Sequence, residues 1–132
     1  MKHLSLATAL ILASCAGDPA LTEKPYFFSL AGSEWGGHDL ADAFVQFQSN
    51  GKLSGHGGCN RFFGTYKQDG IALTIGPLGA TKMMCPPPQM ETETRLMGAL
   101  QNTVSVDATH LVLILKDKDG KALLELQRRD WD

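Results

Sequence analysis

The feature that most constrains this chain is a series of glycine-centred turn signals between short apolar segments. Asn50-Gly51 follows a segment in which apolar and polar residues alternate, Asp69-Gly70 follows an aromatic and β-branched run, and DKDG at 117–120 is a further turn after an apolar run. Asparagine or aspartate followed by glycine favours the tight type I′ turn, because both central residues of that turn have positive φ. Such turns join antiparallel neighbours, so the sequence predicts a series of β-hairpins.

The segments on either side of these turns predict the strands. Alternating apolar residues, many of them aromatic or β-branched, are typical of strands with one buried face. We expect strands at 43–48, 52–54, 62–66, 71–75, 103–106, 111–115 and 122–127, with 78–85 as a further candidate. Three prolines, Pro86 to Pro88, then exclude a strand ladder or a helix interior at these positions.

One helix is predicted, over 89–102. Met90, Met97 and Leu100, with Leu96 beside them, fall on one side of this helix, and the other side carries Glu91, Glu93, Arg95 and Gln101. Acidic residues near its start suit the positive end of the helix dipole. Many short strands and one helix indicate an α+β domain, with a small, strongly curved or partly closed antiparallel sheet.

The N-terminus resembles a lipoprotein signal peptide, which we assign to residues 1–14. A positive start at Lys2 precedes an apolar run at 4–13, which is too short to span a bilayer. The run ends in Leu-Ala-Ser-Cys at 12–15, similar to a lipobox whose cysteine, Cys15, accepts the lipid. An ordinary signal peptide with an incidental cysteine is the alternative.

Lipidation predicts an exported protein anchored in a membrane. Ala16 follows Cys15, and in lipoproteins of Gram-negative type this implies sorting to the outer membrane, facing the periplasm. Residues 15–25 are small, polar and interrupted by proline, which favours a flexible tether, and 26–132 suffice for one domain. The net charge of −2 has no basic stripe, so we expect no nucleic-acid partner, and we expect a monomer.

Two cysteines, Cys59 and Cys85, remain once Cys15 carries lipid. In an oxidising compartment such a pair favours a disulfide; two separately buried thiols are the alternative. Four methionines near Cys85 suggest a pliable apolar groove, although methionines are more often core filler.

The stretch SGHGGCNRFFGTY, at 54–66, has several possible chemistries. A phosphate loop is disfavoured, because a strand rather than a helix follows the glycines. A thiol enzyme using Cys59 with His56, His38 or His110 needs a free thiolate. A zinc site of His56, Cys59, Cys85 and His110 has widely spaced ligands. We favour a sharp bend at the glycines, with no metal, cofactor or catalytic residue.

Three segments carry a resemblance to a known family. Residues 57–66 (GGCNRFFGTY), 73–76 (LTIG) and 81–86 (TKMMCP) resemble the META domain of HslJ-like heat-shock lipoproteins. LAGSEW at 30–35 is similar to the family's first strand, whereas the short 36–41 stretch departs from it. The matching signature residues are Gly57, Gly58, Asn60, Arg61, Phe63, Gly64, Tyr66 and Met84.

The resemblance implies a cracked β-barrel with one packed helix and no established catalysis. It implies a non-enzymatic envelope module that binds or stabilises, linked to heat shock or to antibiotic (novobiocin-type) tolerance. The partner would be an envelope protein or an acyl chain. The alternatives are a periplasmic inhibitor of lysozyme or another envelope hydrolase, and a lipid or peptide binder similar to secretin pilots.

Overall fold

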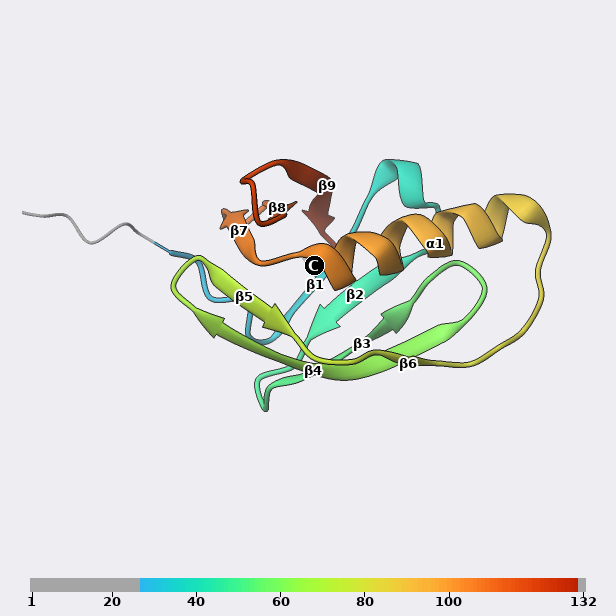
Figure 1. The fold of residues 1–132 in the computed structure, drawn as a ribbon, viewed down its shortest axis with the longest axis horizontal. Coiled ribbons are helices and arrows are strands. Elements are labelled where there is room, and N and C mark those ends of the chain that lie inside the picture. Colours follow the sequence, from blue (N-terminus) through green and yellow to red (C-terminus); the bar gives the residue numbers. More distant parts are fainter. Residues whose placement is uncertain (1–26, 131–132) are drawn as a thin grey trace, which may run out of the picture.

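The computed structural model describes residues 27–130, which form a strand-rich domain with one long helix (Figure 1). The first half contains β1 (Ser33–Gly36), a 3-10 helix η1 (His38–Leu40), β2 (Phe44–Phe47), β3 (Lys52–His56), β4 (Arg61–Asp69), β5 (Ala72–Ile75) and β6 (Gly79–Ala80). The second half contains α1 (Pro87–Asn102), β7 (Ser105–Ala108), β8 (Val112–Lys116) and β9 (Ala122–Arg128). The signal peptide and Cys15 lie outside the described residues.

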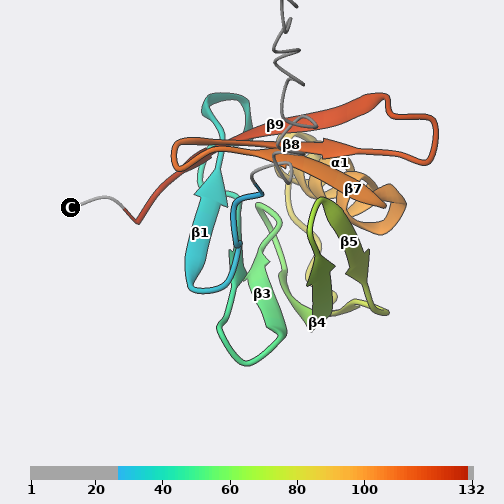
Figure 2. The same ribbon diagram turned by 90° about the vertical axis from the view of Figure 1, so that its left-hand side faces the viewer.

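The strands form one ring-like antiparallel sheet. Its order is β3-β2-β1-β9-β8-β7-β5-β4-β6, and β3 also pairs with β4. Two seams are short: β5 meets β7 at one residue pair, Ala72 with Ser105, and β1 meets β9 at two. Figure 2 shows β7, β8 and β9 lying across the other strands. The α+β class with a strongly curved sheet is therefore confirmed, although the ring is not a regular barrel.

Helix α1 packs into the ring through its apolar side. It lies between the β8–β9 strands and the β2–β4 strands (Figure 1), and its Leu96, Ala99 and Leu100 are buried. The largest buried side chain is Trp35 on β1, whose indole N–H donates to Ser33 Oγ at 2.6 Å. The strands contribute alternate residues to the same core, as their sequence pattern predicts.

The hairpins form where the sequence predicts them, but the turn type differs. Gly51 and Gly120 have positive φ, whereas Asn50 and Asp119 do not. Each of these glycines is the last residue of a three-residue loop. Its N–H donates to the carbonyl oxygen three positions earlier, that of Gln48 for Gly51 and that of Asp117 for Gly120. In the Asp69–Ala72 turn, Gly70 is the first central residue, which is typical of type II′. The type I′ expectation is therefore wrong for the Asn50-Gly51 and Asp69-Gly70 turns.

Two further expectations are corrected around the prolines. The helix begins at Pro87, two residues before the predicted start, because a proline in the first turn lacks only an N–H that would have no helical partner. Glu91 and Glu93 consequently lie beyond the first turn. Of the candidate strand 78–85, only Gly79–Ala80 pairs as a strand. No helix within residues 27–130 has the length and apolarity to cross a bilayer.

Two glycines provide a test of this packing. A Cβ on Gly55 would meet the Phe44 carbonyl oxygen and approach Phe62 Cζ to 2.5 Å, whereas one on Gly98 would meet nothing within 4 Å. We expect Gly55→Ala to lower the free energy of unfolding by about 2–3 kcal/mol through overpacking. Gly98→Ala should raise it by about 0.5–1 kcal/mol, because alanine favours the helix. Urea unfolding of both variants measures this difference, and equal effects would contradict the close approach.

Candidate functional site

The family signature begins in a bend between β3 and β4. The Gly57 N–H donates to the Asn60 carbonyl at 2.8 Å, which closes the bend, and Gly58 has a φ of +116°. That conformation is strained for residues with a side chain. The glycines thus make a sharp reversal and not a phosphate loop, in agreement with the bend we favoured.

Helix α1 lies directly against this bend. A Cβ on Gly57 would lie 2.5 Å from Glu93 Cγ, and one on Gly58 would lie 3.0 Å from the Gln89 carbonyl oxygen. Both glycines are therefore required by the approach of the helix. Glu93, which the sequence places on the outer side of α1, is half-buried and faces the bend.

Asn60 is the centre of the hydrogen bonding. Its side chain is only 4 % exposed. Its amide Nδ2 donates to Glu93 Oε2 at 2.9 Å and to the Met83 carbonyl at 3.1 Å, and its backbone N–H donates to Glu93 Oε1 at 2.5 Å. Its Oδ1 accepts from the Met83 N–H at 2.6 Å and from Thr81 Oγ1 at 3.0 Å. One side chain therefore joins the bend, the 81–83 segment and the helix.

A disulfide links two of these parts, the bend and the segment that leads into the helix. Cys59 and Cys85 are bonded, with their Cα atoms 5.8 Å apart, as the sequence predicts. By the chain-entropy model, a cross-link closing a loop of this length stabilises the fold by about 3–4 kcal/mol. In the disulfide neither sulfur is a thiolate, so this state offers no nucleophile and no zinc ligand at these cysteines. We call Gly57–Asn60, Thr81–Cys85 and Glu93 together the bend cluster.

Gly64 and Tyr66 are also structural. A Cβ on Gly64 would lie 2.8 Å from Leu78 Cδ2, so this glycine lets the 77–78 segment cross β4. The Tyr66 hydroxyl donates to the Gln48 carbonyl at 2.6 Å, and its ring meets the Phe47 ring edge-on at 5.0 Å. Burial raises the pKa of Tyr66 above its usual value.

The remaining signature residues point outward. Arg61, Phe63 and Met84 are exposed, Phe63 by 59 % and Met84 by 87 %. Met83, also exposed, corrects the expectation that these methionines fill the core; of the four, Met97 packs against it.

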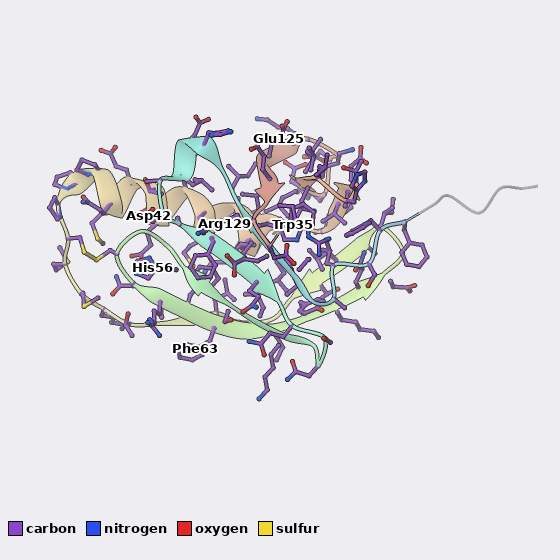
Figure 3. The ribbon with its side chains drawn as sticks, turned by 180° about the vertical axis from the view of Figure 1, so that it is seen from behind. Trp35, Asp42, His56, Phe63, Glu125 and Arg129 are labelled. Carbon is purple, nitrogen blue, oxygen red and sulfur yellow. A yellow bond between two sulfur atoms is a disulfide. The ribbon has the colours of Figure 1, made fainter. Side chains whose placement is uncertain are left out.

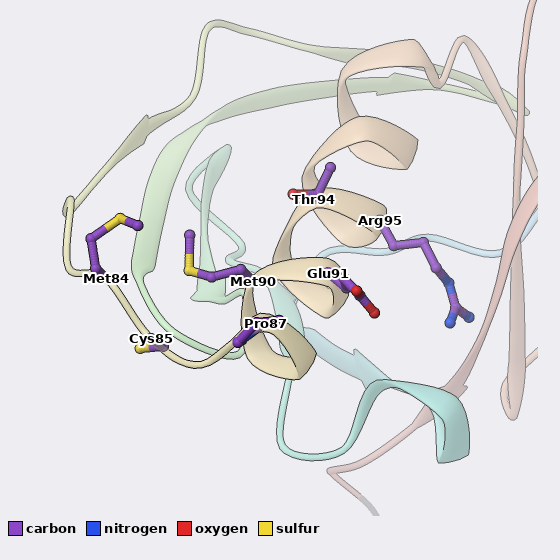
Figure 4. A pocket seen from close by; sticks show the side chains of 7 residues that line it. All are labelled: Met84, Cys85, Pro87, Met90, Glu91, Thr94 and Arg95. Atoms are coloured by element: carbon purple, nitrogen blue, oxygen red, sulfur yellow. The ribbon is translucent and has the colours of Figure 1, made fainter.

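Met84 borders an open apolar groove at the start of α1 (Figure 4). The groove has a volume of about 530 Å³, and its walls are Met84, Cys85, Pro87, Met90, Glu91, Thr94 and Arg95. We call it the Met groove. The sequence suggested a methionine groove without placing it. The sequence pattern did not show that the helix begins at Pro87 and Pro88. This early start brings Met90 opposite Met84.

The three histidines within residues 27–130 are not gathered into one site. His56 ends β3 and accepts the Gly58 N–H at its Nδ1, at 3.1 Å, while His38 lies in η1 and His110 in the β7–β8 turn. Among residues 27–130, no group of three or more His, Cys, Asp or Glu side chains is placed to hold a metal ion.

Comparison with known proteins places the chain in a family. The family model for the META domain matches residues 12–130. No curated protein matches. Among solved structures, a protein from Burkholderia xenovorans is 22 % identical with a TM-score of 0.60, over 99 % of both chains. A DUF4847 family protein from Bacteroides vulgatus is 20 % identical with a TM-score of 0.52, over 69 % of this chain and 62 % of that one. These likenesses concern the fold alone.

The bend cluster predicts a large cost for losing Asn60. Asn60→Ala leaves the Met83 N–H and the Glu93 Oε2 atom without their partner, so the free energy of unfolding should fall by about 2–4 kcal/mol. Asn102→Ala is the matched control, since this exposed asparagine donates only to the Gly98 carbonyl, and it should cost under about 1 kcal/mol. Chemical denaturation with the disulfide intact compares the two.

A charge variant of the same pair separates hydrogen bonding from packing. Asn60→Asp places a second carboxylate beside Glu93 and should destabilise the fold at neutral pH. Adding Glu93→Gln restores a donor to that position, so the double variant should recover part of the loss. Equal costs for Asn60→Ala and Asn102→Ala, or no recovery, would contradict the central role of this pair.

Proposed function

This chain belongs to the META domain family, and we propose that it is a non-catalytic binding module of the cell envelope. The observation that carries the proposal is the exposure of Met84, 87 %, on a segment that the bend cluster holds in place. Exposed apolar side chains on an ordered segment are typical of interaction surfaces. The Met groove is the surface where we expect a partner to bind.

The absence of catalysis is part of this proposal, and the chemistry of the signature supports it. Asn60 and Glu93 hydrogen-bond to each other and to the backbone, and Cys59 and Cys85 share a disulfide. These are the groups in the bend cluster most suited to acid–base or nucleophilic work, and each has a structural partner. A cluster built this way stabilises one arrangement of its segments.

The groove suits an apolar segment of an envelope protein or an acyl chain. Met84 and Met90 supply flexible, polarizable walls that adapt to differently shaped apolar groups. Glu91 and Arg95 lie on the rim, where they can orient a polar end of the partner. Because the disulfide and Asn60 already order the wall, binding costs little further conformational entropy.

We further propose that lipid on Cys15 holds the domain at the outer membrane, facing the periplasm. Phe27, the first described residue, borders the β4–β5 turn, and the segment carrying Met84 loops round the opposite end of the domain (Figure 1). The groove therefore faces away from the point where the tether joins. An HslJ-like role in heat-shock or novobiocin-type tolerance is consistent with such a module.

Site-specific crosslinking in the native host tests the groove. A photoreactive residue at Lys82, beside the groove, should capture discrete envelope partners, and Met84→Glu should reduce the yield at least about fivefold by placing a charge on the apolar wall. The matched control is a photoreactive residue at Lys118, in the β8–β9 turn. Equal capture from Lys118, or no effect of Met84→Glu, would overturn the binding role. Capture of a muramidase, followed by its inhibition in a purified assay, would identify the inhibitor alternative.

Fractionation tests the anchor separately. Cys15→Ala removes the thiol that would carry lipid, so the protein should leave the membrane fraction and lose its radiolabelled fatty acid. Cys85→Ala, which removes a cysteine of the folded domain, is the control and should keep the label. Membrane association of Cys15→Ala at the level of the unaltered protein would show that lipid on this residue does not anchor it.

A further inference from the structure

The outward face of β2, β3 and β4 gathers six side chains in two cross-strand rows. The strand register places Phe44, His56 and Arg61 in one row, and Gln46, Ser54 and Phe63 in the next. The alternate residues of these strands, Val45, Leu53 and Phe62 among them, point into the core. We call this outward surface the sheet face; it shares no residue with the Met groove.

The sheet face is hollowed and not flat. These six residues, with Gly55 and Phe62 at its floor, line a depression of about 400 Å³. Gly55 belongs to the inward row, where the absence of a side chain lets the Phe62 ring approach its backbone closely. The depression is therefore bounded by aromatic rings, neutral polar groups and a cation.

Phe63 is an ordered aromatic ring on the surface. Its partner across the β4–β6 pair is Gly79, and a Cβ on that glycine would lie 2.7 Å from the ring. The ring thus packs on the glycine backbone and yet stays 59 % exposed. Figure 3 shows it projecting outward from β4. A ring held in this way presents a preformed apolar platform to a ligand.

Two arginines flank the platform. The Arg61 guanidinium forms no hydrogen bond or ion pair with any residue in the described range, although it adjoins the hollow. Arg129 crosses Gly36, where a Cβ would lie 2.5 Å from its Cδ, and lies 4.8 Å from the centre of the Phe44 ring. Arg129 forms an ion pair with Glu34, at 3.6 Å, and Glu34 is the cross-strand neighbour of Gln46. Arg61 is therefore the arginine beside the hollow whose charge no carboxylate in the described range balances.

His56 adds a donor of known orientation to the same hollow. Its Nδ1 accepts the Gly58 N–H, so the neutral ring carries its proton on Nε2. Gln46 and Ser54 add an amide and a hydroxyl beside it. Together these groups offer hydrogen-bond donors and acceptors side by side in the hollow.

From these observations we propose that the sheet face binds an acidic glycan, a strand of sugar rings that carry carboxylates. The C–H face of a sugar ring packs on an aromatic ring such as Phe63, and its hydroxyls match the neutral polar groups. A carboxylate on the sugar accepts a bidentate pair of hydrogen bonds from Arg61. A nucleic acid is disfavoured by the net charge of −2. An acidic peptide would use the arginine and leave the Phe63 platform empty.

Calorimetric titration of the purified full chain tests this with two tetrasaccharides. One alternates N-acetylglucosamine with N-acetylmuramic acid, whose lactyl group bears a carboxylate, and the other is neutral chitotetraose. We expect the acidic sugar to bind about 3–10-fold more tightly. Arg61→Gln should remove that difference and leave chitotetraose unaffected. Phe63→Ala should weaken both about tenfold, and Phe63→Tyr should keep both.

The controls come from the opposite end of the domain. Phe27→Ala removes an aromatic ring that is 53 % exposed, and Lys118→Gln removes an exposed cation; neither should change binding. Thermal unfolding of each variant separates loss of the site from loss of the fold. Absence of binding, or equal loss from Phe27→Ala and Phe63→Ala, would overturn the proposal. So would displacement of the sugar by a Glu-rich hexapeptide whose own binding survives Phe63→Ala.

Discussion

The contact between Asn60 and Glu93 is the interaction on which this structure most depends. Both are polar groups in a poorly solvated position, where an unpaired donor or acceptor costs about 1–3 kcal/mol. Between them they bring three separate segments together, because each of these bonds joins the bend to the helix or to the 81–83 segment. The two glycines at 57 and 58 follow from this contact, because the helix cannot reach Asn60 past a side chain. The disulfide next to it adds a covalent link to the same arrangement.

The residues of the family signature fall into two groups, those that lie where segments pack closely and those that are exposed. Gly57, Gly58, Asn60 and Gly64 are needed where segments cross closely, and Tyr66 ties β4 to the neighbouring turn. Arg61, Phe63 and Met84 contribute little that the fold itself requires, since all three are exposed. Phe63 is the clearest case. Its ring packs on Gly79 but stays 59 % exposed, so it adds little to the buried core and leaves an apolar ring accessible to a ligand. We therefore attribute recognition to the outward residues and architecture to the inward ones.

Local signals in the sequence were sufficient for much of the fold and for part of the site. Strand β2 and strand β8 bury alternate residues, and glycine marks three of the hairpin turns, at Gly51, Gly70 and Gly120. What could not be predicted depends on contacts distant in sequence. The sequence pattern places Glu93 on a solvated helix face, whereas in the structure it contacts Asn60, 33 residues earlier. The 78–85 segment has strand composition, yet its Met83 backbone bonds to a side chain instead of a strand.

The Met groove and the sheet face both adjoin the bend cluster, but different interactions hold each of them in shape. The wall of the Met groove includes Cys85, and its Met84 belongs to a segment with little regular structure, so its shape depends on the disulfide and on Asn60. The sheet face depends instead on the β2–β3–β4 register, which backbone hydrogen bonds maintain along each strand. A reducing environment would therefore loosen the groove before it altered the sheet face. Ligand binding at the sheet face should persist in conditions that abolish binding at the groove, because strand pairing does not require the 81–85 segment.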